Sequence, residues 1–456
     1  MTEKNNQKVI VRFPPSPTGL LQMGNVRTLI YNYLFARQNG GKFLLRIEDT
    51  DKERSKKEYE DEIFDDIEWL GFSYDNESKE KVWRSSDRVE IYKQKMQEII
   101  KSGAAYISEE TEGENKQVVR FRNPGGKIKF QDFIRGEIEI DVSDLGDFII
   151  ARNIEDPLYH LAVCVDDSLS GITHIIRGDD HISNTPRQIL IIEALGGQRP
   201  IYAHLPLILA EDKTKLSKRK HGESVSLRYY RNKGYEKEAV INFLALIGWN
   251  PGTEQEIFTL QELLETFDIT KVQKKGGIFN VQKLDWINRE HILKKPKNIQ
   301  IENFIREVKK TKWRDRDKLI DTQFVEKLFN IFIERIHRWG EVGESIDSGE
   351  YDYLFESPEL NPDTIVWKKS SKEKTIEILE GLLKIIQLEP EEKSEKKIRE
   401  KISEYAEREG RGDVLWPLRY SLSGKEKSPG PFTLLSLLDK EESIKRIEKA
   451  LEILKN

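Results

Sequence analysis

The spacing of apolar residues divides the first hundred residues into alternating strands and helices. The runs KVIVRF (residues 8–13) and KFLLRIE (residues 42–48) are short and apolar, which is typical of buried strands. Apolar residues then recur at three- and four-residue steps along residues 26–34, 59–70 and 89–100, and a glycine follows each run, which predicts three helices. Strands that alternate with crossover helices indicate an α/β fold with a parallel sheet. Ser55 with Glu58 is a capping-box pattern before the second helix, and Asp87 is expected to open the third.

This pattern changes twice along the rest of the chain. Between residues 106 and 158 the short runs VVRFR, GGKIKF, GEIEIDV and DFIIAR are separated by turn signals such as NPGG, which predicts a strand-rich insertion. Strand and helix alternate again after residue 159. From residue 298 to the end the spacing is that of amphipathic helices with almost no strand signal, which predicts an all-helical C-terminal region.

Composition narrows the class of protein. The chain has 456 residues, 34% of them charged, and a formal net charge of −5, so any RNA contact must use a local basic face. No apolar run reaches membrane-spanning length, and the polar start MTEKNNQK lacks the apolar core of a signal peptide, so we expect a cytoplasmic protein without membrane contact. The single cysteine, Cys164, excludes intramolecular disulfides and zinc sites built on several cysteines.

The segment RFPPSPTGLLQMGN (residues 12–25) links the first strand to the first helix. Its three prolines fix the path of the loop, and Gly24 removes a Cβ where a ligand can approach the backbone. The helix that follows offers free N–H groups and the positive end of its dipole, which suit a phosphate. The alternative is a plain strand–loop–helix connection without a ligand.

Charged residues follow the predicted strands at the edge where ligands bind in parallel sheets. Arg12 ends the first strand and Glu48 the second, a pair that suits the carboxylate and ammonium groups of an amino acid, unless the two side chains pair with each other or with solvent. Arg177 ends a later strand, and Asp179 and Asp180 after it are expected to cap the next helix or to bind backbone rather than a metal. The basic run DKTKLSKRKHG (residues 212–222) can close over a polyphosphate or remain a solvated or RNA-contacting loop.

Taken in order, RFPPSPTGLLQMGN, RIEDTD, LYHLAVCVDDSLSGITHIIRGDDH and KLSKRKHG resemble the motifs of a bacterial-type glutamyl-tRNA synthetase, a class I aminoacyl-tRNA synthetase. The segments LDWINREHI and PLRYSLSG extend the resemblance over nearly the whole chain, and four motifs in register are far more specific than one. The resemblance implies an α/β, Rossmann-like parallel-sheet catalytic domain in two halves, with a strand-rich acceptor-stem insertion, a connecting domain and an all-α anticodon-binding region. In that order along the chain, the expected segments are 1–105 (first half), 106–158 (insertion), 159–245 (second half, with the KLSKR loop), 246–297 (connecting) and 298–456 (anticodon-binding).

The resemblance also implies roles for individual residues. Those that would bind glutamate are Arg12, Ser16, Glu48, Tyr159 and Arg177, with the two arginines facing the substrate and Ser16 and Glu48 near its α-amino group. Those that would bind ATP are Gln22, Gly24, Asn25, His181, Lys215, Ser217 and Lys218. The counterpart of the family's HIGH motif comprises Pro15, Gln22, Met23, Gly24 and Asn25. The counterpart of its KMSKS loop comprises Lys215, Leu216, Ser217, Lys218 and Arg219.

The implied reaction is the ATP-dependent ligation of glutamate to tRNA-Glu through glutamyl-adenylate, with tRNA-Gln as an open second acceptor. ATP is a substrate, Mg²⁺ is required, and the protein is expected to be a monomer. Some relatives hold zinc through cysteines of the insertion; this chain has none there, so we expect no zinc and no other resident metal. The insertion segment SEETEGENKQ is short, which leaves the acceptor-stem contacts open.

One departure from the family's motifs leaves alternative functions open. Gln22 replaces the first histidine of the HIGH motif; its neutral amide can still donate a hydrogen bond to a phosphate. A catalytically impaired tRNA-binding paralogue is therefore one alternative. A glutaminyl-tRNA synthetase is a second, although its family's anticodon region is a β-barrel and this C-terminal region reads as helical. A tRNA-modifying relative is a third, although it lacks the C-terminal domain.

Overall fold

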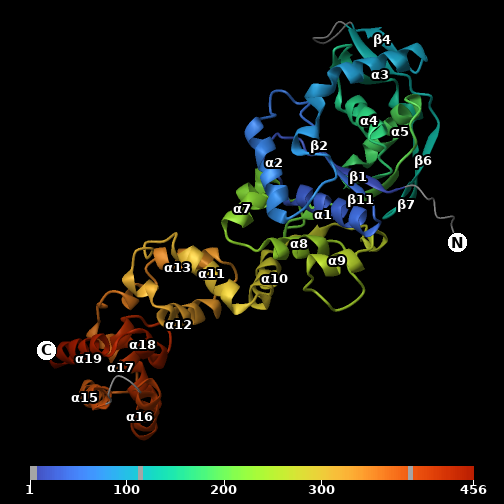
Figure 1. Ribbon diagram of the computed structural model, residues 1–456. Coiled ribbons are helices and arrows are strands. Elements are labelled where there is room, and N and C mark those ends of the chain that lie inside the picture. Colours follow the sequence, from blue (N-terminus) through green and yellow to red (C-terminus); the bar gives the residue numbers. More distant parts are fainter. Residues whose placement is uncertain (1–7, 111–116, 389–393) are drawn as a thin grey trace. The chain divides into compact units, whose positions relative to one another are not determined.

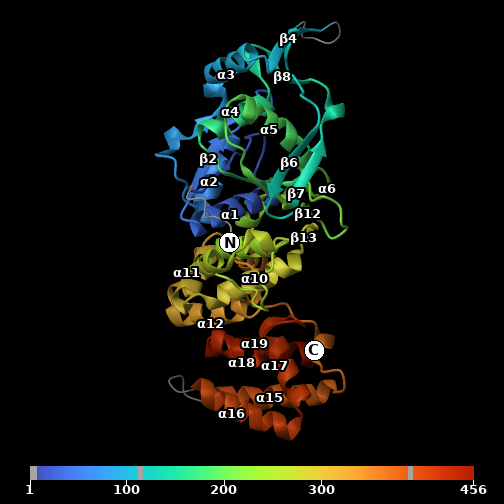
Figure 2. The same cartoon turned by 90° about the vertical axis from the view of Figure 1, so that its right-hand side faces the viewer.

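The computed structural model describes residues 8–110, 117–388 and 394–456. The polar N-terminal residues 1–7 and the middle of the segment SEETEGENKQ lie outside the described residues. The chain divides into two compact units, Met1–Ile292 and Leu293–Asn456 (Figures 1 and 2). Among the described residues, no helix has both the length and the hydropathy needed to cross a bilayer.

A parallel sheet forms the centre of the first unit. Its strands are β1 (Ile10–Phe13), β2 (Lys42–Ile47), β3 (Trp83–Arg84), β10 (His174–Gly178) and β11 (Ile201–Leu205). β1, β2 and β3 pair in parallel, and so do β10 and β11. The backbone N–H of Thr173, just before β10, donates to the carbonyl of Ile10 in β1 at 3.0 Å. The two sets therefore continue each other in the order β3-β2-β1-β10-β11, and this order reverses between β1 and β10, where sheets of this kind bind ligands.

Helices cover both faces of this sheet. The helices around it are α1 (Met23–Gln38), α2 (Lys57–Leu70), α3 (Val89–Lys101), α4 (Tyr159–Leu169), α5 (Thr185–Ala194) and α8 (Lys237–Leu246). Successive strand residues face opposite ways: Ile176 of β10 packs in the core with α1, α2 and α8, and Ile175 packs in the core with α3, α4 and α5. Figure 1 shows α1 and α8 on one side of β1, and α4 and α5 on the other.

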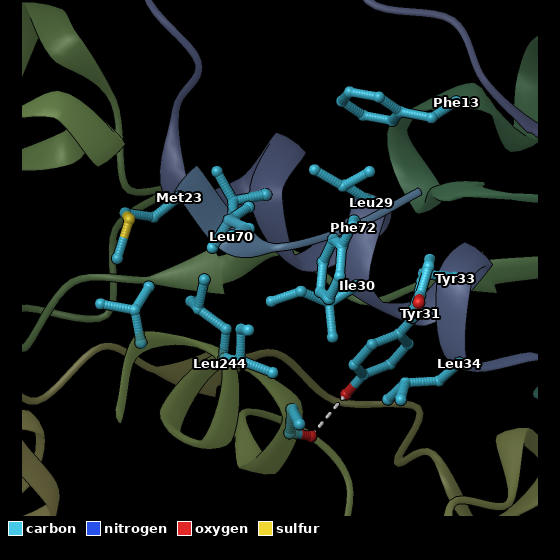
Figure 3. Close-up of a cluster of buried hydrophobic side chains, with 14 of the residues drawn as sticks. Phe13, Met23, Leu29, Ile30, Tyr31, Tyr33, Leu34, Leu70, Phe72 and Leu244 are labelled. Carbon is cyan, nitrogen blue, oxygen red and sulfur yellow. Dashed lines mark hydrogen bonds between the residues drawn. The ribbon is translucent and has the colours of Figure 1, made fainter. Parts of the chain in front are cut away.

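The core on the α1 side contains apolar side chains of both α1 and α8. Figure 3 shows Met23, Leu29, Ile30 and Leu34 of α1 near Leu244 of α8. The hydroxyl of Tyr31, fully buried beside them, satisfies its hydrogen bond at the carbonyl of Ala245, 3.0 Å away. This packing holds the N-terminal end of α1 in a fixed place next to β1.

The strand-rich segment contributes two sheets. One is antiparallel, and its strands are β4 (Ala105–Glu109), β5 (Gln117–Phe121), β8 (Phe148–Asn153) and β9 (Asp156–Pro157). The other is the hairpin of β6 (Lys127–Asp132) and β7 (Gly136–Asp141). β6 pairs with β11, where Asp132 lies opposite Tyr202, so the hairpin extends the central sheet. The predicted strands are confirmed, whereas their junction with the central sheet has no signal in the sequence.

The remaining elements follow the predicted change to helices. Those of the first unit are α6 (Lys218–His221), α7 (Leu227–Asn232), α9 (Leu260–Thr266), β12 (Ile208–Leu209) and β13 (Gly277–Ile278), and α10 (Val281–Lys294) runs across the boundary between the units. Those of the second unit are α11 (Lys297–Val308), α12 (Thr322–Ile333), α13 (Gly340–Asp347), α14 (Pro362–Ile365), α15 (Lys372–Leu388), α16 (Ser394–Glu409), α17 (Arg411–Ser423), α18 (Pro431–Leu437) and α19 (Lys440–Lys455). No strand occurs in the described part of residues 293–456, which confirms the all-helical prediction.

Two predicted helix starts are wrong. α2 begins at Lys57 after an extended Lys56, and no side chain caps it, so Ser55 is not its N-cap. Asp87 lies inside the 3-10 helix η2 (Ser85–Arg88), and α3 begins only after Arg88. The carboxylate of Asp49, just beyond β2, accepts the N–H of Ser86 and so orders this turn from a distant part of the chain.

Candidate active site

A cavity of about 400 Å³ lies at the carboxyl edge of the central sheet, beside the point where the strand order reverses. This volume suits a small-molecule ligand. The sequence-predicted residues that line it are Arg12, Pro15, Ser16, Gln22, Met23, Gly24, Asn25, Glu48, Tyr159, Arg177, His181, Lys215 and Leu216. Ser217, Lys218 and Arg219 are not among the lining residues; Ser217 precedes α6, and Lys218 and Arg219 begin it.

The first turn of α1 presents its backbone to this cavity. Gln22 precedes the helix in an extended conformation, and neither its side chain nor an acidic residue caps the first turn. A Cβ built on Gly24 meets no atom within 4 Å, so the space above this glycine is open. The N–H groups of such a turn have no partner inside the helix and lie at the positive end of its dipole, so this end of the cavity fits a phosphate.

Buried ion pairs surround the ends of β1 and β2. The Nε of Arg12 donates to Asp167 of α4 at 3.2 Å, and Arg46 bridges Asp167 and Glu48, each at 2.9 Å. Arg12 and Glu48 therefore do not pair with each other. Burial works to raise the pKa of Asp167, but Arg12 and Arg46 outweigh it and hold the pKa below its usual range. The only contacts found for Arg12 among the described residues use Nε, so its terminal nitrogens are available to a ligand.

Glu48 lies at the opposite end of this network. Only 6% of the residue is exposed, and burial raises the pKa of its carboxyl despite the contact with Arg46. Because Glu48 lines the cavity, an ammonium group placed there would stabilise the ionised carboxylate.

Arg177 differs from Arg12 and Arg46 in its partners, and resembles Arg27, which donates to the backbone carbonyls of Ile247 and Pro206. It donates to Gln188 Oε1 at 2.6 Å, to Thr185 Oγ1 at 2.8 Å and to His204 Nε2 at 3.2 Å, all of them neutral acceptors. Burial lowers the pKa of its guanidinium. No described carboxylate pairs with Arg177, so a buried positive charge at the cavity wall lacks a counter-ion. An anionic ligand would supply it.

Two rings complete this wall. Burial raises the pKa of Tyr159 to about 12, so its hydroxyl stays protonated and can donate to a ligand. Burial, with a contribution from Arg177, lowers the pKa of His181 to about 4 and keeps that ring neutral near pH 7. The ring centroids of Tyr159 and His181 lie 6.4 Å apart.

The basic loop is connected to both sides of the cavity. Lys215 pairs with Asp180 at 3.0 Å, and Asp179 pairs with Arg135 at 2.8 Å. Neither aspartate caps the helix that follows, so the capping alternative is wrong, whereas a backbone hydrogen bond of Asp180 agrees with the alternative of backbone binding. Their 3-10 helix, η4 (Asp179–Asn184), follows Gly178 without a side-chain cap. After the loop, the N–H of Leu227 donates to the carbonyl of Leu21, directly before Gln22. The side chains of Lys218 and Arg219, which follow the cavity-lining Leu216 along the chain, are exposed.

The sequence interpretation missed the residues that pair with Arg12, Glu48 and Arg177. They are Asp167, Arg46, Gln188, Thr185 and His204. Three of them carry a usable signal: Asp167 and Arg46 are charges inside apolar runs, and His204 is a polar residue in the strand run IYAHL. Within the described residues, no group of three or more histidine, cysteine, aspartate or glutamate side chains is placed to hold a metal ion.

The chain matches two family models. The model of the class I tRNA synthetases (E and Q), catalytic domain, matches residues 8–117 and 107–286, and the model of the anticodon binding domain matches residues 301–451. Among curated proteins, the glutamate–tRNA ligase of Aquifex aeolicus is 39% identical over 98% of this chain and 99% of its own length. The glutamate–tRNA ligase 1 of Petrotoga mobilis is 38% identical over 97% of both chains.

Solved structures agree with these matches. A glutamate tRNA ligase from Elizabethkingia meningosepticum, in complex with its amino acid, superposes with a TM-score of 0.87 at 31% identity and covers 98% of this chain and 100% of its own. The glutamate-tRNA synthetase of Elizabethkingia anophelis gives a TM-score of 0.84 at 31% identity, with the same coverage of both chains. The similarity thus spans the catalytic and the helical parts alike. The chain belongs to the glutamate–tRNA ligase family of class I aminoacyl-tRNA synthetases.

Proposed function

We propose that the cavity beside β1 and β10 is the site at which this glutamate–tRNA ligase activates glutamate with ATP. In the ligase reaction the α-carboxylate of glutamate attacks the α-phosphate of ATP, which gives glutamyl-adenylate and pyrophosphate. A ribose hydroxyl at the 3′ end of tRNA-Glu then takes the glutamyl group. Neither step needs a protein nucleophile, so the cavity residues act by positioning and by stabilising charge.

Glutamate binds between the buried arginines and Glu48 in this proposal. The observation that carries it is Arg177, a buried guanidinium at the cavity wall with neutral protein partners. The side-chain carboxylate of glutamate would supply its missing counter-ion, with Arg12 and Tyr159 beside it, whereas the neutral amide of glutamine would not. Ser16 and Glu48 then face the α-amino group.

ATP binds at the start of α1 in this proposal. The open space above Gly24 admits a phosphate close to the backbone N–H groups, with Gln22, Asn25 and His181 around it. Lys215, Ser217 and Lys218 of the basic loop approach the phosphates as the loop closes. Mg²⁺ enters as the magnesium complex of ATP, held by the phosphates of the substrate.

The helical unit binds the anticodon arm of tRNA in this proposal. It contains a cavity of about 1230 Å³ with several basic side chains on its wall, among them Lys318, Lys327, Arg335 and Arg399. We propose tRNA-Glu as the acceptor, with tRNA-Gln to be tested as a second acceptor in the same assay.

The proposed enzyme acts as a monomer in the cytoplasm, where translation takes place, and uses the five segments predicted from the sequence.

Substitution of the two arginines tests the glutamate site. Arg12→Ala and Arg177→Ala each remove a charge-assisted contact to the substrate carboxylate, so the KM for glutamate should rise by about tenfold or more while the KM for ATP changes little. Initial rates of tRNA-Glu aminoacylation, with glutamate and ATP varied separately, measure both constants. An unchanged glutamate KM in both variants would exclude this site for the amino acid.

A further inference from the structure

A chain of buried hydrogen bonds connects the strand-rich segment to Arg177. Asp132 at the end of β6 lies 2.7 Å from Nδ1 of His204 in β11, and Nε2 of the same ring lies 3.2 Å from Nε of Arg177 in β10. Asp132 and His204 are both buried, and His204 has no exposed surface. The three residues come from three adjacent strands and meet behind the cavity wall.

The partners of Asp132 determine which nitrogen of His204 carries the proton. One carboxylate oxygen accepts the N–H groups of Ile134 and Arg135, each at 2.9 Å, and the other accepts the N–H of His204 at 3.0 Å. A carboxylate with these donors stays ionised, and the contacts with His204 and the backbone hold its pKa below the usual range although burial opposes them. An ionised carboxylate accepts only, so Nδ1 of His204 must carry the proton.

The protonation of Nδ1 fixes the role of the other ring nitrogen. Burial lowers the pKa of His204, so the ring is neutral and Nε2 keeps its lone pair. The Nε–H of Arg177 donates to this lone pair, and the hydroxyl oxygen of Thr185, which accepts from Nη2 of Arg177, lies 3.1 Å from the same nitrogen. A proton on Nε2 would place two donors, Nε2 and Nε of Arg177, against each other. The other tautomer would therefore displace the guanidinium from its position.

We propose that Asp132 and His204 are positioning residues for glutamate recognition: Asp132 holds His204 as the Nδ1–H tautomer, and Nε2 of that tautomer orients Arg177 toward the substrate carboxylate. This inference rests on the proposed role of Arg177 in binding glutamate. It assigns part of the specificity of the site to a residue of the strand-rich segment that does not line the cavity.

A purely structural role is the competing explanation, because Asp132 also orders the turn after β6. The charged and titratable groups around His204 are Asp132, Arg135, Arg177, Asp179, His181 and Tyr202. Of these groups, Arg177 is the one that donates a hydrogen bond to Nε2 of His204. A structural role of Asp132 would affect all substrates alike, whereas the positioning role affects glutamate.

Kinetics of the full-length protein separate the two explanations. Asp132→Asn keeps the shape of the side chain but offers an amide N–H to His204, so the KM for glutamate in tRNA-Glu aminoacylation should rise about tenfold and the KM for ATP should stay within about twofold. Asp66→Asn, another buried aspartate of the same unit, is the matched control and should leave the glutamate KM unchanged. Equal increases of both constants in Asp132→Asn would overturn the inference.

A double-mutant cycle keeps the test decisive if Asp132→Asn also destabilises the protein. The glutamine side chain of the His204→Gln variant has no tautomers. Asp132→Asn should therefore change the glutamate KM of the His204→Gln variant by less than about twofold. An effect of Asp132→Asn that is as large in the His204→Gln background as in the wild type would refute the tautomer mechanism. If Arg177→Ala itself leaves the glutamate KM unchanged, the proposed function of the arginine fails; if only the Asp132 effect is absent, this inference alone fails.

Discussion

At the scale of single residues, Gln22 is the departure from its family's pattern that bears most directly on activity. It stands just before α1, with its side chain exposed at the cavity, where the resemblance places a histidine. The backbone N–H groups of α1 are present whichever residue stands there, and the amide of Gln22 can donate to a phosphate oxygen. We therefore expect the protein to be active.

Substitution of Gln22 measures how much its amide contributes to the rate of adenylate formation. Gln22→Ala should slow adenylate formation by about 1.5–3 kcal/mol in activation free energy, the contribution of one hydrogen bond to a charged group. Gln22→His should be tolerated. Pyrophosphate exchange with tRNA-Glu present measures the rates. A wild-type protein that binds tRNA-Glu but shows no exchange would instead be the catalytically impaired paralogue.

Residues at strand ends were predictable, and their partners were not. Arg12, Glu48 and Arg177 each follow a short apolar run, so the rule that parallel strands place ligands at one edge was enough to find them. Asp167 and His204 pair with them across intervals of 155 and 27 residues. Such pairings depend on the order of strands and helices in space, which a single sequence does not specify.

At the scale of elements, the contact between α2 and α7 contains a carboxyl without hydrogen bonds. Both carboxylate oxygens of Asp66 are buried without a hydrogen-bond partner among the described residues, and the carboxylate forms only a long ion pair with Nη1 of Arg231, 3.6 Å away. Burial, reinforced by Glu62, raises the pKa of Asp66 to about 7. This folded-state pKa lies above the unfolded value of about 3.9, so the folded protein binds the extra proton between these two pH values.

The raised pKa of Asp66 makes the free energy of unfolding depend on pH. Stability from Asp66 is fully present below its unfolded pKa and is lost as the pH rises toward 7. Asp66→Asn, which mimics the protonated carboxyl, should stabilise the first unit by about 1–3 kcal/mol at pH 8 and change little at pH 4. Thermal unfolding of wild type and variant at both pH values measures this difference. A difference that does not vary with pH would contradict the raised pKa.

The boundaries of elements were less predictable than their types. The strands, the helices and the change to an all-helical region are present as expected, because apolar periodicity over long windows reflects packing. The starts of α2 and α3 were misassigned because the capping signals of Ser55 and Asp87 are local, whereas a contact from Asp49 orders the turn before α3. Tertiary contacts override local capping in such cases.

At the scale of the whole molecule, the two compact units match different family models. The residues proposed for glutamate and ATP all lie before residue 220, and the match to the anticodon binding domain covers residues 301–451. With a formal net charge of −5, the protein must present any RNA-binding surface as a local basic face. The cavity of the helical unit is a candidate for such a face.

The guanidinium of Arg399 in that cavity lies 5.2 Å from the ring centroid of Phe432, and unstacked bases bind to such aromatic and guanidinium planes. Arg399→Ala should therefore raise the KM for tRNA-Glu by about tenfold and leave the KM values for glutamate and ATP unchanged. Arg408→Ala is the matched control, because Arg408 also lies on α16 and over a ring, that of Tyr405, but does not line the cavity. Aminoacylation with tRNA varied measures the effect, and equal tRNA KM values for the two variants would exclude this cavity from the tRNA-binding surface.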